Sequence, residues 1–261
     1  MIAASTTPWT FEGIRVIGDV HGEAQSFKSA IDQAHAKNLF VVALGDLVDR
    51  GPDSVGALRL GLELLDRGTG LFLRSNHDDK LRRALLGNPV TVGPELKRTL
   101  DAIAAGPDRG LFVARVREAL QAAPWWLRAG DYLLAHGGFH PAMLTARGPE
   151  AVSSRDDADA CRRFAIYGEV DKRAASRGEP PVRTYGWLDT VPPGVTVVIG
   201  HDVISTEKIV ERRGALGGRL LFCDTGCGRG GPLSFLDLPG AGVWLPSPPG
   251  AKSRVPDFDR Q

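Results

Sequence analysis

Short apolar runs that alternate with stretches of helical spacing limit this chain to few folds. Between the first runs, one apolar helical face extends from Phe27 to Ala34 and another from Val55 to Leu65. Short strands of this kind must be covered on both faces, so the alternation predicts an α/β fold of sheets and packed helices. The expected strands are residues 14–18, 39–45, 71–74, 131–136, 195–201, 219–223 and 233–238.

The pattern changes between residues 87 and 124, where two short helical stripes replace the strands. The first stripe includes Leu96 and Ile103, and the second includes Val113 and Leu120. Nothing in this segment indicates catalysis. We expect a helical insert that either caps one side of a site or completes the core as an ordinary helical pair.

The C-terminal end is dense in Pro and Gly. This composition predicts that residues 241–261 form an irregular tail, docked in part through Trp244 and Leu245. The whole sequence of 261 residues is 43% hydrophobic, which is enough for one sizeable core. We expect a single domain over residues 1–240.

The charge balance and the N-terminus exclude several classes of protein. Lys and Arg number 32 against 31 Asp and Glu, so no overall basic field directs the chain to nucleic acid or to an anionic membrane. The first residues lack the pattern of a secretory signal, and no apolar run is long enough to span a membrane. The sequence predicts a cytoplasmic protein.

Polar clusters follow five of the expected strands. In open α/β sheets the carboxyl ends of the strands line the ligand crevice, so residues far apart in sequence converge there. Glycines beside the clusters allow sharp turns and close backbone approach. The clusters hold Asp19 and His21, then Asp46, Asp49 and Arg50, then Asn76 and His77, and finally His136 and His201.

Imidazole, carboxylate and carboxamide groups without a thiolate suit borderline divalent ions such as Mn, Fe or Zn. Asp19 and His21 stand two residues apart, which on an extended chain places both side chains on one face. Asp46 is the natural bridging carboxylate. Two ions about 3.5 to 4 Å apart deprotonate a bridging water and clamp phosphoryl oxygens, so the pattern predicts phosphoester hydrolysis.

A rival interpretation comes from the cysteines. Cys161, Cys223 and Cys227 cannot form a closed disulfide framework, and free thiols are expected. Cys223 to Arg229 has the C-x5-R spacing of the cysteine phosphatases. That loop must run into a helix whose N-terminus binds phosphate, whereas Pro232 and the alternation after it indicate another strand.

The motifs GDVHG, GDLVDRG, NHD, AHGG and GH, in that order, resemble those of the calcineurin-like metallophosphoesterases, in the branch of the phosphoprotein phosphatases and symmetrical dinucleoside tetraphosphate hydrolases. The C-terminal half is similar to the phosphatase module of bacterial polynucleotide kinase-phosphatases. No kinase motif of the G-x-x-x-x-G-K-[ST] type is present. The resemblance implies two packed mixed sheets flanked by helices.

The resemblance also implies a role for each motif residue. His77, oriented by Asp49, would be the general acid, while Arg50 and Arg183 would bind phosphate and Asp224 would support the metals. A metal-bridging hydroxide would attack the substrate. One metal would be held by Asp19, His21 and Asp46, and the second by Asp46, Asn76, His136 and His201.

Two positions depart from the family pattern. Ser75 stands where Gly is usual, and Asp202 follows the last metal histidine. The first prediction for the substrate is a phosphomonoester, as in the Ser/Thr phosphatases. The alternatives are symmetrical hydrolysis of dinucleoside tetraphosphates, cleavage of phosphodiesters at nucleotide or RNA ends, and a catalytically weak phosphate-binding scaffold. Basic residues between 142 and 185 are interleaved with acidic ones, which favours a solvated surface over a polyanion site.

Overall fold

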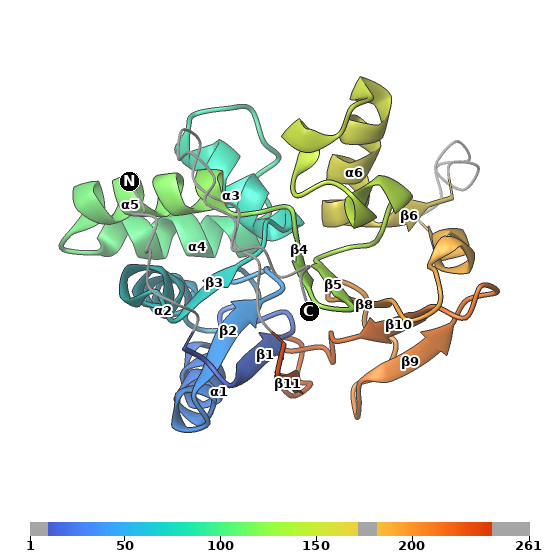
Figure 1. The fold of residues 1–261 in the computed structure, drawn as a ribbon. Coiled ribbons are helices and arrows are strands. Elements are labelled where there is room, and N and C mark those ends of the chain that lie inside the picture. The colour runs from blue at the N-terminus through green and yellow to red at the C-terminus, as the bar shows by residue number, and fades with distance from the viewer. Residues whose placement is uncertain (1–9, 172–181, 242–261) are drawn as a thin grey trace.

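Two mixed β-sheets packed face to face form the centre of the molecule (Figure 1). The computed structural model describes residues 10–171 and 182–241. The first sheet has the order β11 (Phe235–Pro239), β1 (Gly13–Ile17), β2 (Leu39–Ala43) and β3 (Gly70–Phe72). Strands β1, β2 and β3 are parallel, and β11 is antiparallel to β1.

The second sheet has the order β4 (Trp126–Ala129), β5 (Tyr132–Ala135), β8 (Thr196–Ile199), β10 (Arg219–Phe222) and β9 (Val210–Arg213). Its three central strands are parallel, and the strands at both edges are antiparallel. A separate two-stranded ladder joins β6 (Glu169–Val170) to β7 (Arg183–Thr184). The carboxyl ends of the parallel strands of both sheets are therefore available to build one site.

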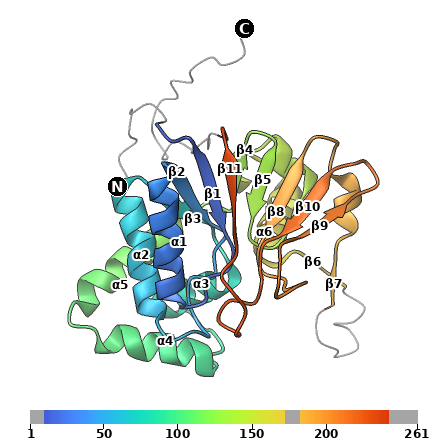
Figure 2. The same ribbon diagram turned by 90° about the horizontal axis from the view of Figure 1, so that it is seen from below.

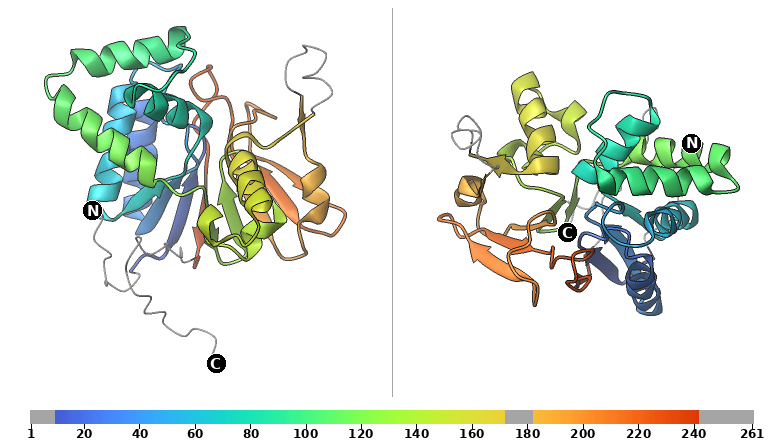
Figure 3. Two further views of the ribbon diagram at one scale, coloured as in Figure 1. Left: turned by 90° about the horizontal axis from the view of Figure 1, so that it is seen from above. Right: turned by 180° about the vertical axis from the view of Figure 1, so that it is seen from behind.

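Helices cover the outer faces of the sheets, as the alternating sequence predicts. Figures 2 and 3 show α1 and α2 outside the first sheet and α6 outside the second. Three short 3-10 helices accompany α6. The helices are α1 (Ala24–Ala36), α2 (Ser54–Arg67), α3 (Asn76–Leu85), α4 (Pro94–Ala105), α5 (Arg109–Ala122) and α6 (Arg155–Tyr167), and the 3-10 helices are η1 (Pro141–Leu144), η2 (Pro149–Ala151) and η3 (Gly186–Thr190).

Three apolar cores separate these layers. Alternation along β1 sends Val16 into the core between the sheets and Ile17 into the core under the helices. The core between the sheets also takes Val198 from β8, and a third core on the outer face of the second sheet contains Trp126. The expectation of two packed mixed sheets flanked by helices is confirmed.

The insert contributes α4 and α5, which pack against α2 and α3. Leu96 and Ile103 of α4 and Val116 and Leu120 of α5 belong to the core under the helices. The insert therefore completes the core. In addition, α4 reaches the candidate site, as described below. The predicted tail lies outside the described residues, except for Ala241.

None of the helices in the described part of the chain is long and apolar enough to cross a membrane.

Candidate metal centre

The predicted site residues occupy loops at the carboxyl ends of the parallel strands of both sheets. Asp19 and His21 follow β1, and Asp46 follows β2. Asn76 and His77 open α3, after β3, while His136 follows β5 and His201 follows β8. The structure therefore brings ligands from two sheets to one place.

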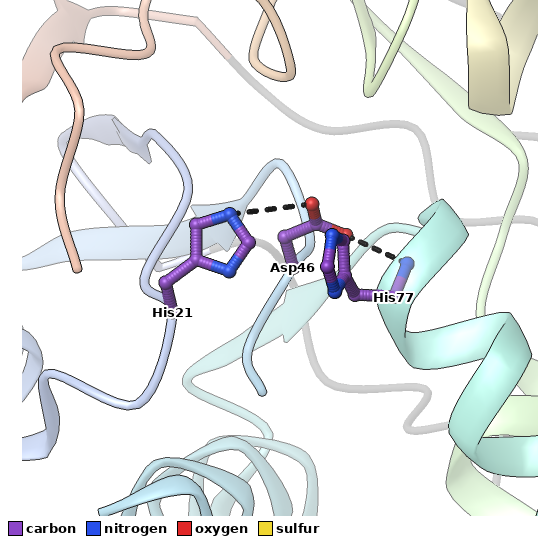
Figure 4. Close-up of side chains that lie close together, drawn as sticks. All are labelled: His21, Asp46 and His77. Atoms are coloured by element: carbon purple, nitrogen blue, oxygen red, sulfur yellow. Dashed lines mark hydrogen bonds and ion pairs between the residues drawn. The ribbon is translucent and has the colours of Figure 1, made fainter. Parts of the chain in front are cut away.

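Asp46 lies at the centre of this group. Its Oδ2 is 3.5 Å from Nε2 of His21, and its Oδ1 is 3.5 Å from Nε2 of His136. Figure 4 shows Asp46 between His21 and His77, with the backbone N–H of His77 donating to Oδ1 at 3.1 Å. Each oxygen of one carboxylate faces a different histidine, which is the geometry a bridging ligand needs.

Backbone carbonyls fix the tautomers of two histidines. Nδ1 of His21 lies 3.0 Å from the Val48 carbonyl, and Nδ1 of His136 lies 3.1 Å from the Leu44 carbonyl. A carbonyl only accepts, so each Nδ1 carries a proton and each Nε2 presents a lone pair. Burial lowers the pKa of His21 to about 4 and also lowers the pKa of His136. Both rings are therefore neutral, as metal binding requires.

His201 completes the second histidine pair. Its Nδ1 is 3.1 Å from Nε2 of His136, and the two rings meet edge to face. Burial lowers the pKa of His201 to about 2. Asn76 Oδ1 lies 2.9 Å from the same His136 nitrogen, so the donor atoms of three residues converge on one point.

Three carboxylates at the site are almost fully buried. Asp19 is 1% exposed, Asp46 is 1% exposed and Asp224 is 2% exposed. Burial, together with the charges of Asp224 and Asp46, raises the pKa of Asp19 well above its usual value.

Clustered buried carboxylates are costly unless cations compensate them. In the described part of the chain, Asp224 Oδ2 and His201 Nε2 are buried without a hydrogen-bond partner. The nitrogen and oxygen donors form two groups that share Asp46, one with His21 and His77 and one with His136 and His201. Both the charge and the donor set fit divalent ions of the Mn, Fe or Zn type.

The loops that present the ligands adopt unusual backbone conformations. Outside the glycines of the described chain, positive φ angles occur at Asn38 and at five site residues: His21 (45°), Asp46 (47°), Asp49 (71°), Arg50 (67°) and His201 (68°). Side chains disfavour this region, and such strain gathers at functional sites.

Ser75, the first departure from the family pattern, has a structural role. It is the N-cap of α3, and its hydroxyl accepts from the backbone N–H of Asp46 at 2.8 Å and of Asp78 at 3.4 Å. Ser75 thus joins the loop of Asp46 to the first turn of the helix that carries Asn76 and His77. It supports the ligand geometry instead of disturbing it.

Asp49 and His77 form a hydrogen-bonded pair beside the candidate metal ligands. Asp49 Oδ2 lies 2.7 Å from Nδ1 of His77, and Asp49 Oδ1 accepts from the hydroxyl of Thr99 at 2.8 Å. Burial lowers the pKa of His77, but the hydrogen bond to Asp49 and nearby carboxylates raise it to above its usual value. Thr99 belongs to α4, which the sequence analysis considered free of site residues.

The two predicted phosphate-binding arginines are both engaged. Nη1 of Arg50 contacts Nε2 of His21. Nε of Arg183 forms an ion pair with Asp202 Oδ1 at 2.5 Å, and the Tyr185 hydroxyl donates to Asp202 Oδ2 at 2.9 Å. Asp202, the second departure from the family pattern, therefore holds the side chain of Arg183.

Two hollows of about 410 and 420 Å³ adjoin the site on the side of α4. Asp49, Glu95 and Arg98 line both of them. His77 and Lys80 line the first, and Arg50 lines the second. Neither Lys80 nor Arg98 forms an ion pair with another described residue.

The cysteine-phosphatase interpretation fails on this structure. Cys223 is fully buried, and burial raises the pKa of its thiol to about 12, so the nucleophilic thiolate is absent near neutral pH. No helix follows Arg229 in the described residues; the chain continues into β11. Cys161 and Cys227 are also buried free thiols.

A helix–sheet–sheet–helix fold with His, Asp and Asn side chains gathered at the strand ends is the arrangement of a metal-dependent hydrolase of phosphate esters. Residues 14–215 match the model of the calcineurin-like phosphoesterases, and the chain belongs to this family. The enzymes of this family use divalent metal ions.

Relatives named asymmetrical bis(5'-nucleosyl)-tetraphosphatase PrpE match along most of the chain. The protein of Halalkalibacterium halodurans is 26% identical over 238 residues, covering 86% of this chain and 89% of its own length. That of Bacillus subtilis is 26% identical over 239 residues, covering 86% of this chain and 90% of its own length.

Solved structures share the fold. A crystal structure provisionally assigned as a diadenosine tetraphosphatase superposes with a TM-score of 0.56 at 23% identity, covering 91% of this chain and 94% of that chain. A cold-active protein-tyrosine phosphatase of a psychrophilic Shewanella gives a TM-score of 0.53 at 18% identity, covering 88% and 76% of the two chains.

Proposed function

We propose that this phosphoesterase hydrolyses dinucleoside tetraphosphates at a centre of two divalent ions, with Mn²⁺ as the first candidate and Fe or Zn as alternatives. The main support is the match to the PrpE tetraphosphatases over about nine-tenths of their length. The sequence analysis favoured phosphomonoesters and held dinucleoside tetraphosphates as an alternative. The relatives favour that alternative.

The ligand roles follow the geometry around Asp46. We assign Asp46 as the bridge, because its two oxygens face different histidines. One ion is assigned to Asp19, His21 and Asp46, and the other to Asp46, Asn76, His136 and His201. When bound, such ions lower the pKa of a water nucleophile and neutralise phosphoryl oxygens. Asp224 supports Asp19 from the second sheet.

His77 is assigned as the general acid. Its Nδ1 is held by Asp49, which leaves Nε2 to carry the proton that passes to the leaving oxygen as the P–O bond breaks. In Figure 4, His77 lies beside Asp46 in the opening turn of α3. Arg50 and Arg183 are assigned to the phosphate oxygens, which a planar guanidinium matches in pairs.

The hollows beside His77 support a substrate with more than one phosphate. Lys80 lines the first and Arg98 lines both, and neither has an ion-pair partner among the described residues, although Glu95 shares the space. A leaving group that carries several phosphates would bring its own negative charge to these cations.

The products decide the mode of cleavage. Diadenosine tetraphosphate yields ATP and AMP when cut asymmetrically and two ADP when cut symmetrically. Because the relatives are named as asymmetrical enzymes, we expect ATP and AMP, in contrast to the symmetrical cleavage that the sequence motifs suggested.

The deciding experiment incubates metal-stripped protein, with and without Mn²⁺, with diadenosine tetraphosphate, a phosphoserine peptide, a 3'-phosphorylated oligonucleotide and an aryl phosphodiester. Asp46→Asn is the inactive control. Mn²⁺-dependent release of ATP and AMP, lost in the control, supports the proposal. Preferential turnover of the phosphopeptide would instead identify the protein as a phosphomonoesterase. Metal binding without any turnover would favour the scaffold.

A further inference from the structure

The inner face of α4 contains one polar residue among apolar ones. Leu96, Thr99 and Ile103 follow helical spacing, and all three side chains are buried. Leu96 and Ile103 pack into the core under the helices, whereas Thr99, at 2% exposure, is the buried polar residue between them. A buried hydroxyl is unfavourable unless it is hydrogen-bonded, so an apolar residue would serve packing alone better.

The Thr99 hydroxyl has one proton to donate, and three acceptors lie near it. Asp49 Oδ1 is 2.8 Å away, Ser54 Oγ is 3.2 Å away and the Glu95 carbonyl is 3.4 Å away. The carboxylate is both the nearest acceptor and the charged one, and hydrogen bonds to charged groups are the strongest. The proton is therefore directed to Asp49.

Asp49 needs this support because of its place in the chain. It adopts a left-handed backbone conformation, with φ at 71°, and the next residue, Arg50, does the same. Its backbone N–H donates to Ser54 Oγ at 3.0 Å, and its Oδ2 meets His77. Oδ1 is the remaining anchor point of the carboxylate, and Thr99 occupies it.

We propose that Thr99 is a positioning residue of the reaction, which holds the Asp49 carboxylate so that Asp49 aims the imidazole of His77 at the leaving group. The inference rests on the role of His77 given under Proposed function. It makes the helical insert part of the proton-transfer apparatus, because α4 supplies the outermost member of the chain Thr99, Asp49, His77.

Removal of the Thr99 hydroxyl should impair only the donation of a proton by His77 to the leaving group. In the Mn²⁺-loaded full chain, Thr99→Val keeps the shape of the side chain and deletes the donor. We expect kcat to fall about 10- to 100-fold on an alkyl phosphate, the range seen when an outer hydrogen-bond partner is lost. For an aryl phosphate or diadenosine tetraphosphate, whose aryl oxide and polyphosphate leaving groups need little protonation, kcat should change less than about threefold. KM should stay unchanged on all of these substrates.

Three comparisons separate positioning from packing. Thr99→Ser retains the hydroxyl and should restore most of the kcat. Ile103→Val trims the same face of α4 without touching a hydrogen bond, and any loss it causes should be equal on both substrates. In the double variant Thr99→Val/His77→Ala, activity should match that of His77→Ala alone, because the two residues act in series.

The outcomes distinguish this inference from the function on which it rests. No leaving-group dependence in His77→Ala would remove the acid role of His77 itself. Leaving-group dependence in His77→Ala but not in Thr99→Val, or a Thr99→Ser variant as impaired as Thr99→Val, would overturn the role of Thr99 alone. If Thr99→Val does not fold, Thr99→Ala is measured in the same way, with the same split expected.

Discussion

Arg15 of β1 and Asp237 of β11 stand directly opposite each other and form a two-pronged ion pair, with contacts of 2.6 and 2.8 Å. The guanidinium is fully buried between the first sheet and the helices that cover it. It also donates to the Ala30 carbonyl of α1, and it lies over the ring of Phe235. A buried guanidinium that loses its carboxylate is left uncompensated. This pair joins the last strand of the domain to the first.

Asp237→Asn should lower the free energy of unfolding by about 1 to 3 kcal/mol, because it leaves the buried Arg15 guanidinium without its charged acceptor; Asp237 itself is 25% exposed and also bonds Lys37. The comparison is made by urea denaturation at pH 7. Asp32→Asn, at an exposed pair with Lys28, is the matched control and should stay close to wild type. An equally small effect at both positions would show that the Arg15 pair contributes nothing measurable.

The same pair should make stability depend on pH. The hydrogen bond from Arg15 lowers the pKa of Asp237 to about 2, whereas an unfolded Asp titrates near about 3.9. A lowered pKa stabilises the fold above the unfolded value, and this contribution is lost as pH falls through the folded value. The difference between wild type and Asp237→Asn should therefore shrink between about pH 5 and pH 2. A constant difference would contradict the assignment.

Chelation should destabilise the enzyme, because the buried carboxylates Asp19, Asp46 and Asp224 lose their compensating charge. Each ion at 100 times its dissociation constant adds about 2.7 kcal/mol. For a domain of this size, treatment with EDTA should lower the Tm by about 5 to 10 °C for each ion removed. Added Mn²⁺ should restore the Tm, and Asp46→Asn should show no response to either treatment.

Gly200→Ala should weaken metal binding without unfolding the chain. A Cβ at this position would lie 2.1 Å from Asp19 Oδ1, and the carboxylate has to move away. We expect the affinity for Mn²⁺ to fall about 10- to 100-fold in a calorimetric titration. Gly110→Ala, where a Cβ meets nothing within 4 Å, is the control and should bind as wild type. Unchanged affinity in Gly200→Ala would exclude Asp19 as a ligand.

His77→Ala tests the general acid. We expect kcat on alkyl phosphates to fall about 10²- to 10⁴-fold, with a much smaller loss on aryl phosphates and on diadenosine tetraphosphate, whose leaving groups need little protonation. Equal losses on both kinds of substrate would assign His77 to structure or binding.

Arg98→Gln tests whether the hollows beside His77 receive phosphate groups. Loss of one charged hydrogen bond should raise KM for diadenosine tetraphosphate about tenfold and leave KM for an aryl monophosphate unchanged. Arg109→Gln, on α5 and outside the residues that line the hollows, is the control. The same increase for both substrates would place Arg98 outside any polyphosphate subsite.

Most of the strands were predictable because they are apolar and short. The sequence-based prediction missed β4, which is buried but only four residues long, and three further strands that carry little of this signal. In β9, Glu211, Arg212 and Arg213 are exposed on an edge, so their pattern lacks buried positions. The two-residue strands β6 and β7 are too short for any period to be read. Sequence patterns reveal burial, and these three segments bury little of their own surface.

The prediction of the site was most complete where a residue ends a strand. His136 and His201 could be placed from sequence because apolar runs lead directly to them. Thr99 could not, because it contributes through a tertiary contact and its own segment reads as a plain amphipathic helix. The ion pair between Arg183 and Asp202 was likewise invisible, since 18 residues, including η3 and β8, separate the two along the chain.

The assigned ligands begin at Asp19 and end at His201, and they belong to strands of two different sheets. During synthesis, the parallel strands β1 to β3 emerge with Asp19, His21, Asp46 and Asn76, whereas β8 and its histidine follow more than 100 residues later. A nascent chain can thus hold an ion only loosely until the second sheet has docked. Binding of both ions therefore requires that nearly the whole domain has been translated and that its two sheets have packed together.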